Sequence, residues 1–231
     1  PKDYIIDLPI PSNHSGLEKI FNIEKVDGDV VEDREIEDNH FFNIVKDNSL
    51  YHDDPDCAEG WMPPRHNRYH IPKYEYQKED EVPIPPSLRE AIMSFILTSA
   101  CRNYRGYVED GKSMLIHVSK FQDVQHIVFK QVSDFTDTLR ARMQAGHYLH
   151  DDTISKFEEI WHKNFYIHKD KTEEKMPTWQ DLLDHKYSLK FVVNEVCRNI
   201  KVLNGKSDDT LDYDNFVNEN DFGLHTIIIG G

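Results

Sequence analysis

The chain has 231 residues, of which 38% are hydrophobic and 30% are charged, and its formal net charge is −15. This composition is typical of a folded globular protein and differs from that of a disordered chain. No run of 18 apolar residues occurs, so we expect a cytoplasmic protein without a membrane partner. Three cysteines (Cys57, Cys101 and Cys197) lie far apart in the sequence. Their odd number argues against a disulfide framework and favours a reducing compartment.

The negative charge is unevenly distributed. Residues 1–85 contain 9 Lys and Arg against 20 Asp and Glu, a net −11, whereas residues 86–231 contain 18 against 22, a net −4. A nucleic-acid-binding domain is usually basic on its binding face. The chain as a whole does not fit that class, so any contact with DNA requires a local basic patch.

Residues 1–85 are predicted to form an irregular acidic arm or linker. Residues 4–9 predict a short strand, and Ser15 begins one or two turns of a predicted helix. The rest shows no strong periodicity and is rich in acidic residues, then in proline and histidine. Its aromatic side chains suggest that the arm lies over a protein surface.

A strong helix signal begins at residue 86. Ser87 and Glu90 match the S-x-x-E capping box, and Gly106 supplies a stop. The apolar run SMLIHVS (113–119) then predicts a strand covered on both faces, as in a parallel sheet.

The remaining sequence alternates helices with strands. The spacing predicts a long amphipathic helix over 120–144, a helix over 151–166 capped by Asp151 or Asp152, and one or two helices from Thr178. Residues 200–205 and 225–231 predict two further buried strands. The order α, β, α, α, α, β, β indicates a three-layer α/β fold.

Familiar catalytic motifs are absent from the sequence: it has no phosphate loop, no G-x-G-x-x-G, no H-E-x-x-H, no G-x-S-x-G and no C-x-x-C. Cys57, His66 and His70 suggest a metal site, but Pro63, Pro64 and Pro72 disfavour the helix that would bring the histidines together, and an incidental grouping is the better interpretation. The carboxylates of HDDPD (52–56) are best interpreted as solvated loop charge.

The corner after the first strand is the best candidate site. Open α/β sheets bind ligands at the carboxyl ends of their strands, and a helix N-terminus favours phosphate. Ser119 is expected to cap the following helix there, with His117 and Lys120 beside it. An ordinary strand–loop–helix corner remains the alternative. Arg102 and Arg105 are also candidates for nucleic-acid contact, although cations near a helix C-terminus often serve only the helix dipole.

Five stretches resemble the Z1 (Z-one) domain of predicted bacterial endonucleases, which accompanies superfamily-two helicase-like ATPases. The most specific stretch is LIHVS (115–119) with its following aromatic residue and Asp-Val-Gln. The others are YIIDLPIPSNHSGLEKIFN, PPSLREAIMSFILTSACRNYRG, IKVLNGKSDDTLDY and HTIIIGG.

The resemblance implies part of a RecA-like, helicase second-lobe-like parallel sheet over 86–231, with a helical insertion at about 147–198 and an arm (1–85) arriving from a preceding lobe. It places a phosphate loop upstream and an arginine motif downstream, so we expect a truncated chain. Gly230 and Gly231 would then face a nucleotide cleft, and ATP and Mg would be cofactors of the full-length protein, not of this fragment. Residues 113–130 would match the region that contacts the nucleic-acid backbone.

The resulting hypothesis is a fragment of a helicase-like, nucleotide-dependent protein that acts on DNA in restriction-modification-like or phage-defence systems. Whether the protein is an enzyme is left open, and the fragment alone is expected to be inactive. The alternative is a non-catalytic scaffolding domain that binds a partner ATPase or nuclease subunit. A nuclease site within the chain is disfavoured, because FEEIWHK (157–163) does not supply the required acidic residue and D/E-x-K on adjacent strands.

Overall fold

The computed structural model describes residues 45–51, 54–74, 83–145, 152–166, 175–205 and 208–230, and the backbone of residues 25–26 and 29–30. The chain divides into two compact units, 1–46 and 47–231. In the first unit, β1 (Lys25–Val26) and β2 (Asp29–Val30) pair antiparallel. The strand and helix predicted at residues 4–22 lie outside the described residues.

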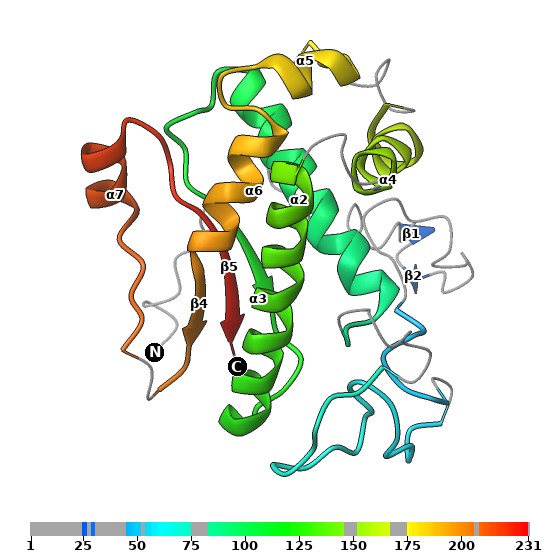
Figure 1. The fold of residues 1–231 in the computed structure, drawn as a ribbon. Coiled ribbons are helices and arrows are strands. Elements are labelled where there is room, and N and C mark those ends of the chain that lie inside the picture. The colour runs from blue at the N-terminus through cyan, green and yellow to red at the C-terminus, as the bar shows by residue number, and fades with distance from the viewer. Residues whose placement is uncertain are drawn as a thin grey trace. The chain divides into compact units, whose positions relative to one another are not determined.

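The second unit contains a parallel sheet of three strands, with β5 in the centre (Figure 1). The strands are β3 (Lys112–Ile116), β4 (Ile200–Leu203) and β5 (His225–Gly230). Ile116 pairs with Ile229, and Ile229 with Val202, so these three side chains share one face of the sheet. The three predicted strands and the mixed α/β class are thereby confirmed.

One prediction about β3 is wrong. The apolar run predicted a strand covered on both faces, but Leu115 is 63% exposed whereas its neighbour Ile116 is 3% exposed. Leu115 shares the other face of the sheet with Ile228 and Lys201, which are also only partly buried, so this face is less completely covered.

Helices fill the sequence between and before the strands, largely where the periodicity predicted them. Their bounds are α2 (Pro86–Tyr104), α3 (Gln122–Ala145), α4 (Thr153–Ile160), the π-helical turn η4 (Trp161–Phe165), α5 (Trp179–Asp184), α6 (Leu189–Arg198) and α7 (Tyr213–Asn220). The eight-residue α7 was not predicted, although Asp212 caps it by accepting from the N–H of Asn215. None of the described helices is long and apolar enough to cross a membrane.

Helices α3 and α6 contact each other and pack on β5, in front of the strands in Figure 1. The predicted apolar stripe of α3 is buried, including Val124, Val128 and Val132, each 0% exposed. Helix α2 contacts α4, α5 and α6, and it buries residues on several sides. A helix that is apolar all round is expected to lie inside a protein in this way.

The start of α2 corrects the predicted capping box. Pro86 is the first helical residue, so Ser87 stands one position inside the helix and its side chain does not cap it. Proline suits the first helical position, because the N–H that it lacks would have had no partner there. Asp47, which lies 40 residues earlier in the chain, supplies the acceptor for the helix N-terminus instead. Its carboxylate accepts from the Ser87 N–H at 2.9 Å and from the Ser87 hydroxyl at 2.5 Å.

We predict that Asp47→Ala destabilises the chain by about 1–2 kcal/mol, because it removes both the acceptor for a helix N–H and a negative charge from the helix N-terminus. The free energy of unfolding in urea measures the effect. Asp208→Ala is the matched control, since Asp208 is exposed and caps no helix. Equal losses in the two variants would contradict the role given to Asp47.

Candidate functional site

Two sets of hydrogen bonds connect the carboxyl ends of the three strands. Nδ1 of His117, just after β3, lies 3.0 Å from the carbonyl oxygen of Gly230 at the end of β5. Asn204, just after β4, donates to Oε1 of Gln125 at 3.0 Å. The Gln125 amide in turn donates to the carbonyl of Ser119 at 2.8 Å. The buried Gln125 therefore links the corner after β3 to the end of β4.

Ser119 has a different role from the helix cap that was predicted. Helix α3 begins at Gln122, and the N–H of Gln125 donates to the carbonyl of Phe121, so Phe121 occupies the capping position. The Ser119 hydroxyl accepts from the N–H of Phe121 at 3.1 Å, and Ser119 stands two residues before the capping position. It shapes the tight corner that leads from the strand into α3.

The same hydroxyl pairs with a histidine from a distant segment. Nε2 of His66 lies 2.9 Å from the Ser119 Oγ, and Nδ1 of His66 lies 2.9 Å from the Pro63 carbonyl. A carbonyl only accepts, so Nδ1 carries a hydrogen and Nε2 of the neutral ring accepts from the serine. A serine beside a histidine can form a nucleophile and base. Here Ser119 is only 4% exposed and also accepts from Phe121, so the pair fixes the two segments together.

The segment held by this pair is basic and aromatic. From residue 60 to residue 74 it contains no Asp or Glu, although the chain carries −15 overall. We call residues 60–74, with His117 and Lys120, the basic edge. The indole of Trp61 donates to Gln131 of α3 at 2.9 Å, and Gln131 donates to the carbonyl of Pro72 at 2.8 Å. These buried hydrogen bonds fix both ends of the segment on α3.

Several of the side chains at the surface of the basic edge are cationic or aromatic. Tyr69 is 77% exposed, and the Arg68 guanidinium lies 5.2 Å from its ring centre. Arg68 also approaches Asp123 at 3.5 Å, and Arg65 pairs with Asp56 at 2.5 Å. Exposed cations and the exposed imidazole complete the surface: Lys73, Lys120 and His117.

The histidines of this segment do not form a metal site with Cys57. The Cys57 thiol donates to the carbonyl of Glu59, and Nε2 of His70 lies 3.0 Å from the carbonyl of Trp61. No group of three or more His, Cys, Asp or Glu within the described residues is placed to hold a metal ion.

The sequence profile of the Z1 domain matches residues 87–231, more than half of the chain. The chain belongs to the Z1 domain family. The match confirms the Z1 domain itself, and it covers the sheet, α3 and the corner at Ser119, whereas the stretch YIIDLPIPSNHSGLEKIFN lies outside it. Searches of the curated proteins and of the solved structures find no match.

Two predicted site residues of the Z1 domain lie at the opposite end of β3 from the basic edge. Arg102 and Arg105 stand at the C-terminus of α2, which leads into the start of β3. Arg102 pairs with Asp110 at 2.7 Å and lies over the Tyr107 ring, and Arg105 donates to the Lys175 carbonyl. The structure therefore does not bring them together with His117, Ser119 and Lys120. Gly231, the other predicted cleft residue beside Gly230, lies outside the described residues.

A second polar cluster is buried at the amino end of the sheet. His225 is 0% exposed, and the Asn103 amide approaches its Nε2 at 3.3 Å. Burial, reinforced by the Lys112 charge, lowers the pKa of His225 to about 4. Burial also lowers the pKa of Lys112 to about 8, although its ammonium group donates to the carbonyls of Tyr107 and Asp110. Within the described part of the chain, Nδ1 of His225 and the side-chain oxygen of Asn103 are buried without a hydrogen-bond partner.

Sequence reasoning missed three parts of the candidate site. Gln125 and Asn204 gave no signal, because single polar residues acquire partners only through the tertiary fold. His66 was considered only as a metal ligand. The acid-free run of residues 60–74 was visible in the sequence and marks the basic edge.

We predict that the chain loses stability as the pH falls from about 6.5 to about 4. In the unfolded state His225 has a pKa of 6.5 and binds a proton within this window. In the folded state its pKa is about 4, so it stays unprotonated until the lower end of the window. The unfolding free energy falls by up to ~3 kcal/mol across the window.

The variant His225→Phe should flatten this pH dependence in urea unfolding measured between pH 7.5 and 4. His162→Phe is the control, because His162 is exposed and lies 3.9 Å from its nearest carboxylate. Identical pH slopes in the wild type and both variants would show that another group is responsible.

Proposed function

We propose that this Z1 domain is part of a helicase-like, nucleotide-dependent protein that acts on DNA in a bacterial restriction-modification-like or phage-defence system. We further propose that its basic edge binds the DNA. The main observation behind this proposal is segment 60–74, which contains basic and aromatic residues and no Asp or Glu. Hydrogen bonds fix this segment beside the carboxyl ends of a parallel sheet.

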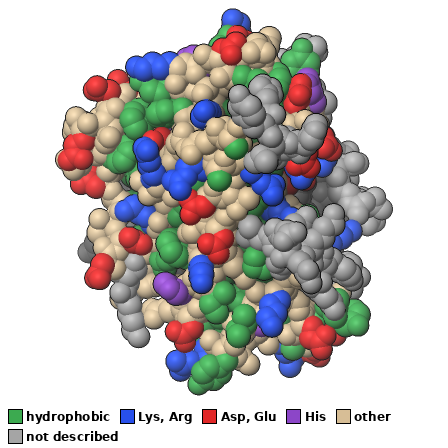
Figure 2. Space-filling view, viewed as in Figure 1, with side chains coloured by type: hydrophobic (Ala, Val, Ile, Leu, Met, Phe, Trp, Pro, Cys, Tyr) green, Lys and Arg blue, Asp and Glu red, His purple; other side chains and the backbone are tan. Residues whose placement is uncertain are grey.

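Charge and exposure both support a nucleic-acid surface at the basic edge. Arg65, Arg68, Lys73 and Lys120 are four exposed cations in a strongly acidic chain. Cations of this kind bind phosphates, while an exposed ring such as Tyr69 offers a base a stacking surface. Figure 2 shows cationic and anionic side chains interspersed on the viewed face, so a basic contact must be local.

The position on the fold also supports the proposal. Ligands of open parallel sheets bind at the carboxyl ends of the strands. In a RecA-like lobe with helices on both faces, which we propose for the complete domain, the corner after a strand would meet the nucleic-acid backbone. The resemblance assigns that contact to residues 113–130, which include His117, Ser119 and Lys120.

The site proposed for ATP and Mg belongs to a longer protein. The sequence has no phosphate loop, and the described residues hold no cluster of carboxylates for a metal. At Gly230 a Cβ atom would stand 3.2 Å from the Leu203 carbonyl oxygen. The close packing of the strands is therefore a sufficient reason for a glycine at this position. We therefore propose that ATP and Mg bind a longer protein, with Gly230 and Gly231 at the border of its cleft.

We predict that the chain binds a fluorescent DNA oligonucleotide weakly at low salt, and that Arg68→Ala with Lys120→Ala reduces this binding. Removing one cation that touches a phosphate should lower the slope of log affinity against log salt by about one. Fluorescence anisotropy measures both effects. Tyr69→Ala should weaken single-stranded binding more than duplex binding, because unpaired bases can stack on the ring.

The matched control removes two exposed cations elsewhere, with Lys186→Ala and Lys190→Ala. A control pair that weakens DNA binding as much as the basic-edge pair would show non-specific attraction. Absence of DNA binding in the wild type at low salt would rule out the basic edge as an autonomous DNA site.

We also predict that a longer protein containing this chain hydrolyses ATP faster when DNA is present, whereas the 231-residue chain alone hydrolyses none. Release of inorganic phosphate, measured with and without DNA, tests this. A properly folded longer protein with no hydrolysis on any DNA would contradict the nucleotide-dependent part of the proposal.

A scaffolding role is the second candidate, and the acidic character of the chain favours it. The net charge of −15 repels DNA and suits a basic protein partner. On this interpretation the Z1 domain binds an ATPase or nuclease subunit of the same system. A complex with such a subunit, without DNA binding by either the chain or the longer protein, would favour this candidate over the first.

A further inference from the structure

A cavity of about 320 Å³ lies between α2, α3 and the α4–η4 segment. It is remote from the basic edge, since an α-helix rises about 1.5 Å per residue and Leu139 in the cavity wall stands some 27 Å along α3 from Phe121. None of the residues proposed for DNA or nucleotide contact lines it.

The wall of the cavity is apolar and fixed. Four of its apolar side chains are buried members of the hydrophobic core: Met93, Phe135, Leu139 and Ile160. Core side chains are closely packed and hold their positions, so the cavity exists before any ligand arrives. Its volume lies at the lower end of the range for small-molecule sites.

The rim of the cavity is cationic. It carries four cations, Arg89, Arg142, Lys156 and Lys163, against two carboxylates, Glu90 and Glu159. The difference is two positive charges, in a chain whose total is −15. An apolar wall beneath a cationic rim matches an organic molecule with an apolar body and an anionic group.

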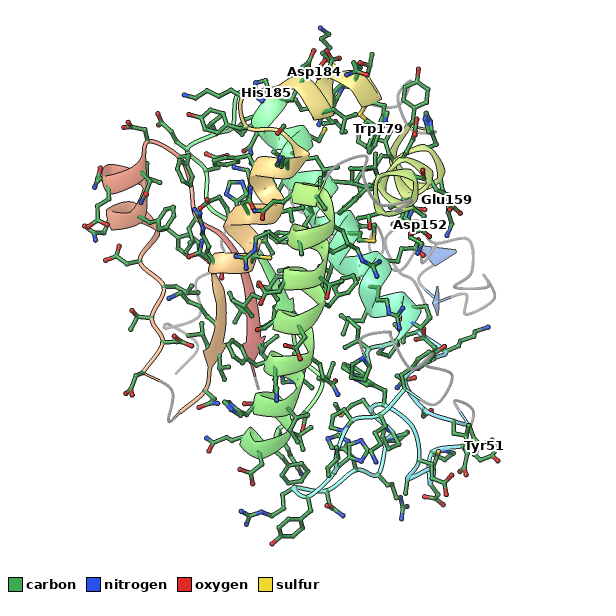
Figure 3. All side chains as sticks on the ribbon, viewed as in Figure 1. Tyr51, Asp152, Glu159, Trp179, Asp184 and His185 are labelled. Carbon is green, nitrogen blue, oxygen red and sulfur yellow. The ribbon has the colours of Figure 1, made fainter. Side chains whose placement is uncertain are left out.

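Neighbouring groups fix the positions of the rim cations. Glu90 accepts from Lys163 at 3.1 Å and from the Asn164 amide at 2.9 Å, and these hydrogen bonds lower the pKa of Glu90. Lys156 pairs with Asp152 at 2.7 Å; Asp152 and Glu159 are labelled beside α4 in Figure 3. The Nε–H of Arg89 donates to the carbonyl of Ile84. The ion pairs reduce the local excess of charge but hold the lysines at the opening.

We infer that this cavity binds a small amphipathic anion, with the apolar body against the wall of Phe135 and Leu139 and the anionic group between Arg142 and Lys156. Carboxylate, sulfonate and phosphate groups share the required chemistry, and all accept charge-assisted hydrogen bonds. The ligand is a small molecule, because the cavity has no room for a folded segment.

The test uses two fluorescent probes of similar shape. The first, 1-anilinonaphthalene-8-sulfonate, is anionic, and the second, N-phenyl-1-naphthylamine, lacks the sulfonate. We expect one molecule of the anionic probe to bind per chain, more tightly than the neutral probe. Octanoate and octyl phosphate should each displace it, and their order distinguishes a carboxylate site from a phosphate site.

Two sets of variants locate the site. Arg142→Gln with Lys156→Gln removes exposed rim cations and should weaken the anionic probe about tenfold while leaving the neutral probe unchanged. Thr138→Phe places a ring at the half-exposed edge of the cavity and should weaken both probes. Lys186→Gln with Lys190→Gln is the matched control and should change neither probe, and circular dichroism confirms that each variant is folded.

Three results would overturn the inference. They are no stoichiometric binding of the anionic probe, anionic binding that survives both cavity variants, and binding of the neutral probe as tight as that of the anion. Displacement by octyl phosphate and octanoate with equal strength supports the inference and identifies a general anion site.

Discussion

The central position of β5 is the constraint on which the second unit depends. This last strand inserts between β3 and β4, and it is parallel to both. Parallel neighbours cannot be joined by tight turns, so each connection must return to the other end of the sheet. Helices α3 to α6 make the first return and α7 lies in the second. The carboxyl ends of all three strands consequently meet, which brings His117, Asn204 and Gly230 to one edge.

Buried polar side chains connect this edge to the rest of the unit. Gln131 accepts a hydrogen bond from the Trp61 indole and donates one to the carbonyl of Pro72. Gln125 connects Ser119 to Asn204 through hydrogen bonds. Leaving one such amide without its partner would cost roughly 1–3 kcal/mol, so these hydrogen bonds oppose detachment of the irregular segment from α3. The exposed side chains of the basic edge therefore project from a rigid base, although the segment has no helix or strand of its own.

The parts of the structure that depend on local apolar patterns were predictable, and those that depend on tertiary contacts were not. The strands and the stripe of α3 followed from runs and spacing of apolar residues. The capping box at Ser87 failed because Pro86 moved the helix start and Asp47 supplied the acceptor from outside the helix. The π-helical turn that follows α4 likewise has no simple sequence pattern. The basic edge was predictable only in part. Its composition can be read from the local sequence, whereas its attachment through His66 depends on a tertiary contact.

The net charge of −15 does not by itself exclude anionic ligands, because electrostatic interactions in salt solution act only over a short range. At physiological salt the screening length is about 8 Å, so an exposed phosphate responds mainly to charges in its immediate surroundings. Residues 60–74 lack acidic groups of their own, although Asp56 and Asp123 pair with two of their arginines, and the rim of the cavity has more cations than carboxylates. The distant carboxylates slow the approach of an anion more than they weaken its contact. On the two binding proposals made here, an acidic chain with two local cationic surfaces would select ligands that make close contacts and would disfavour loose attraction to any polyanion.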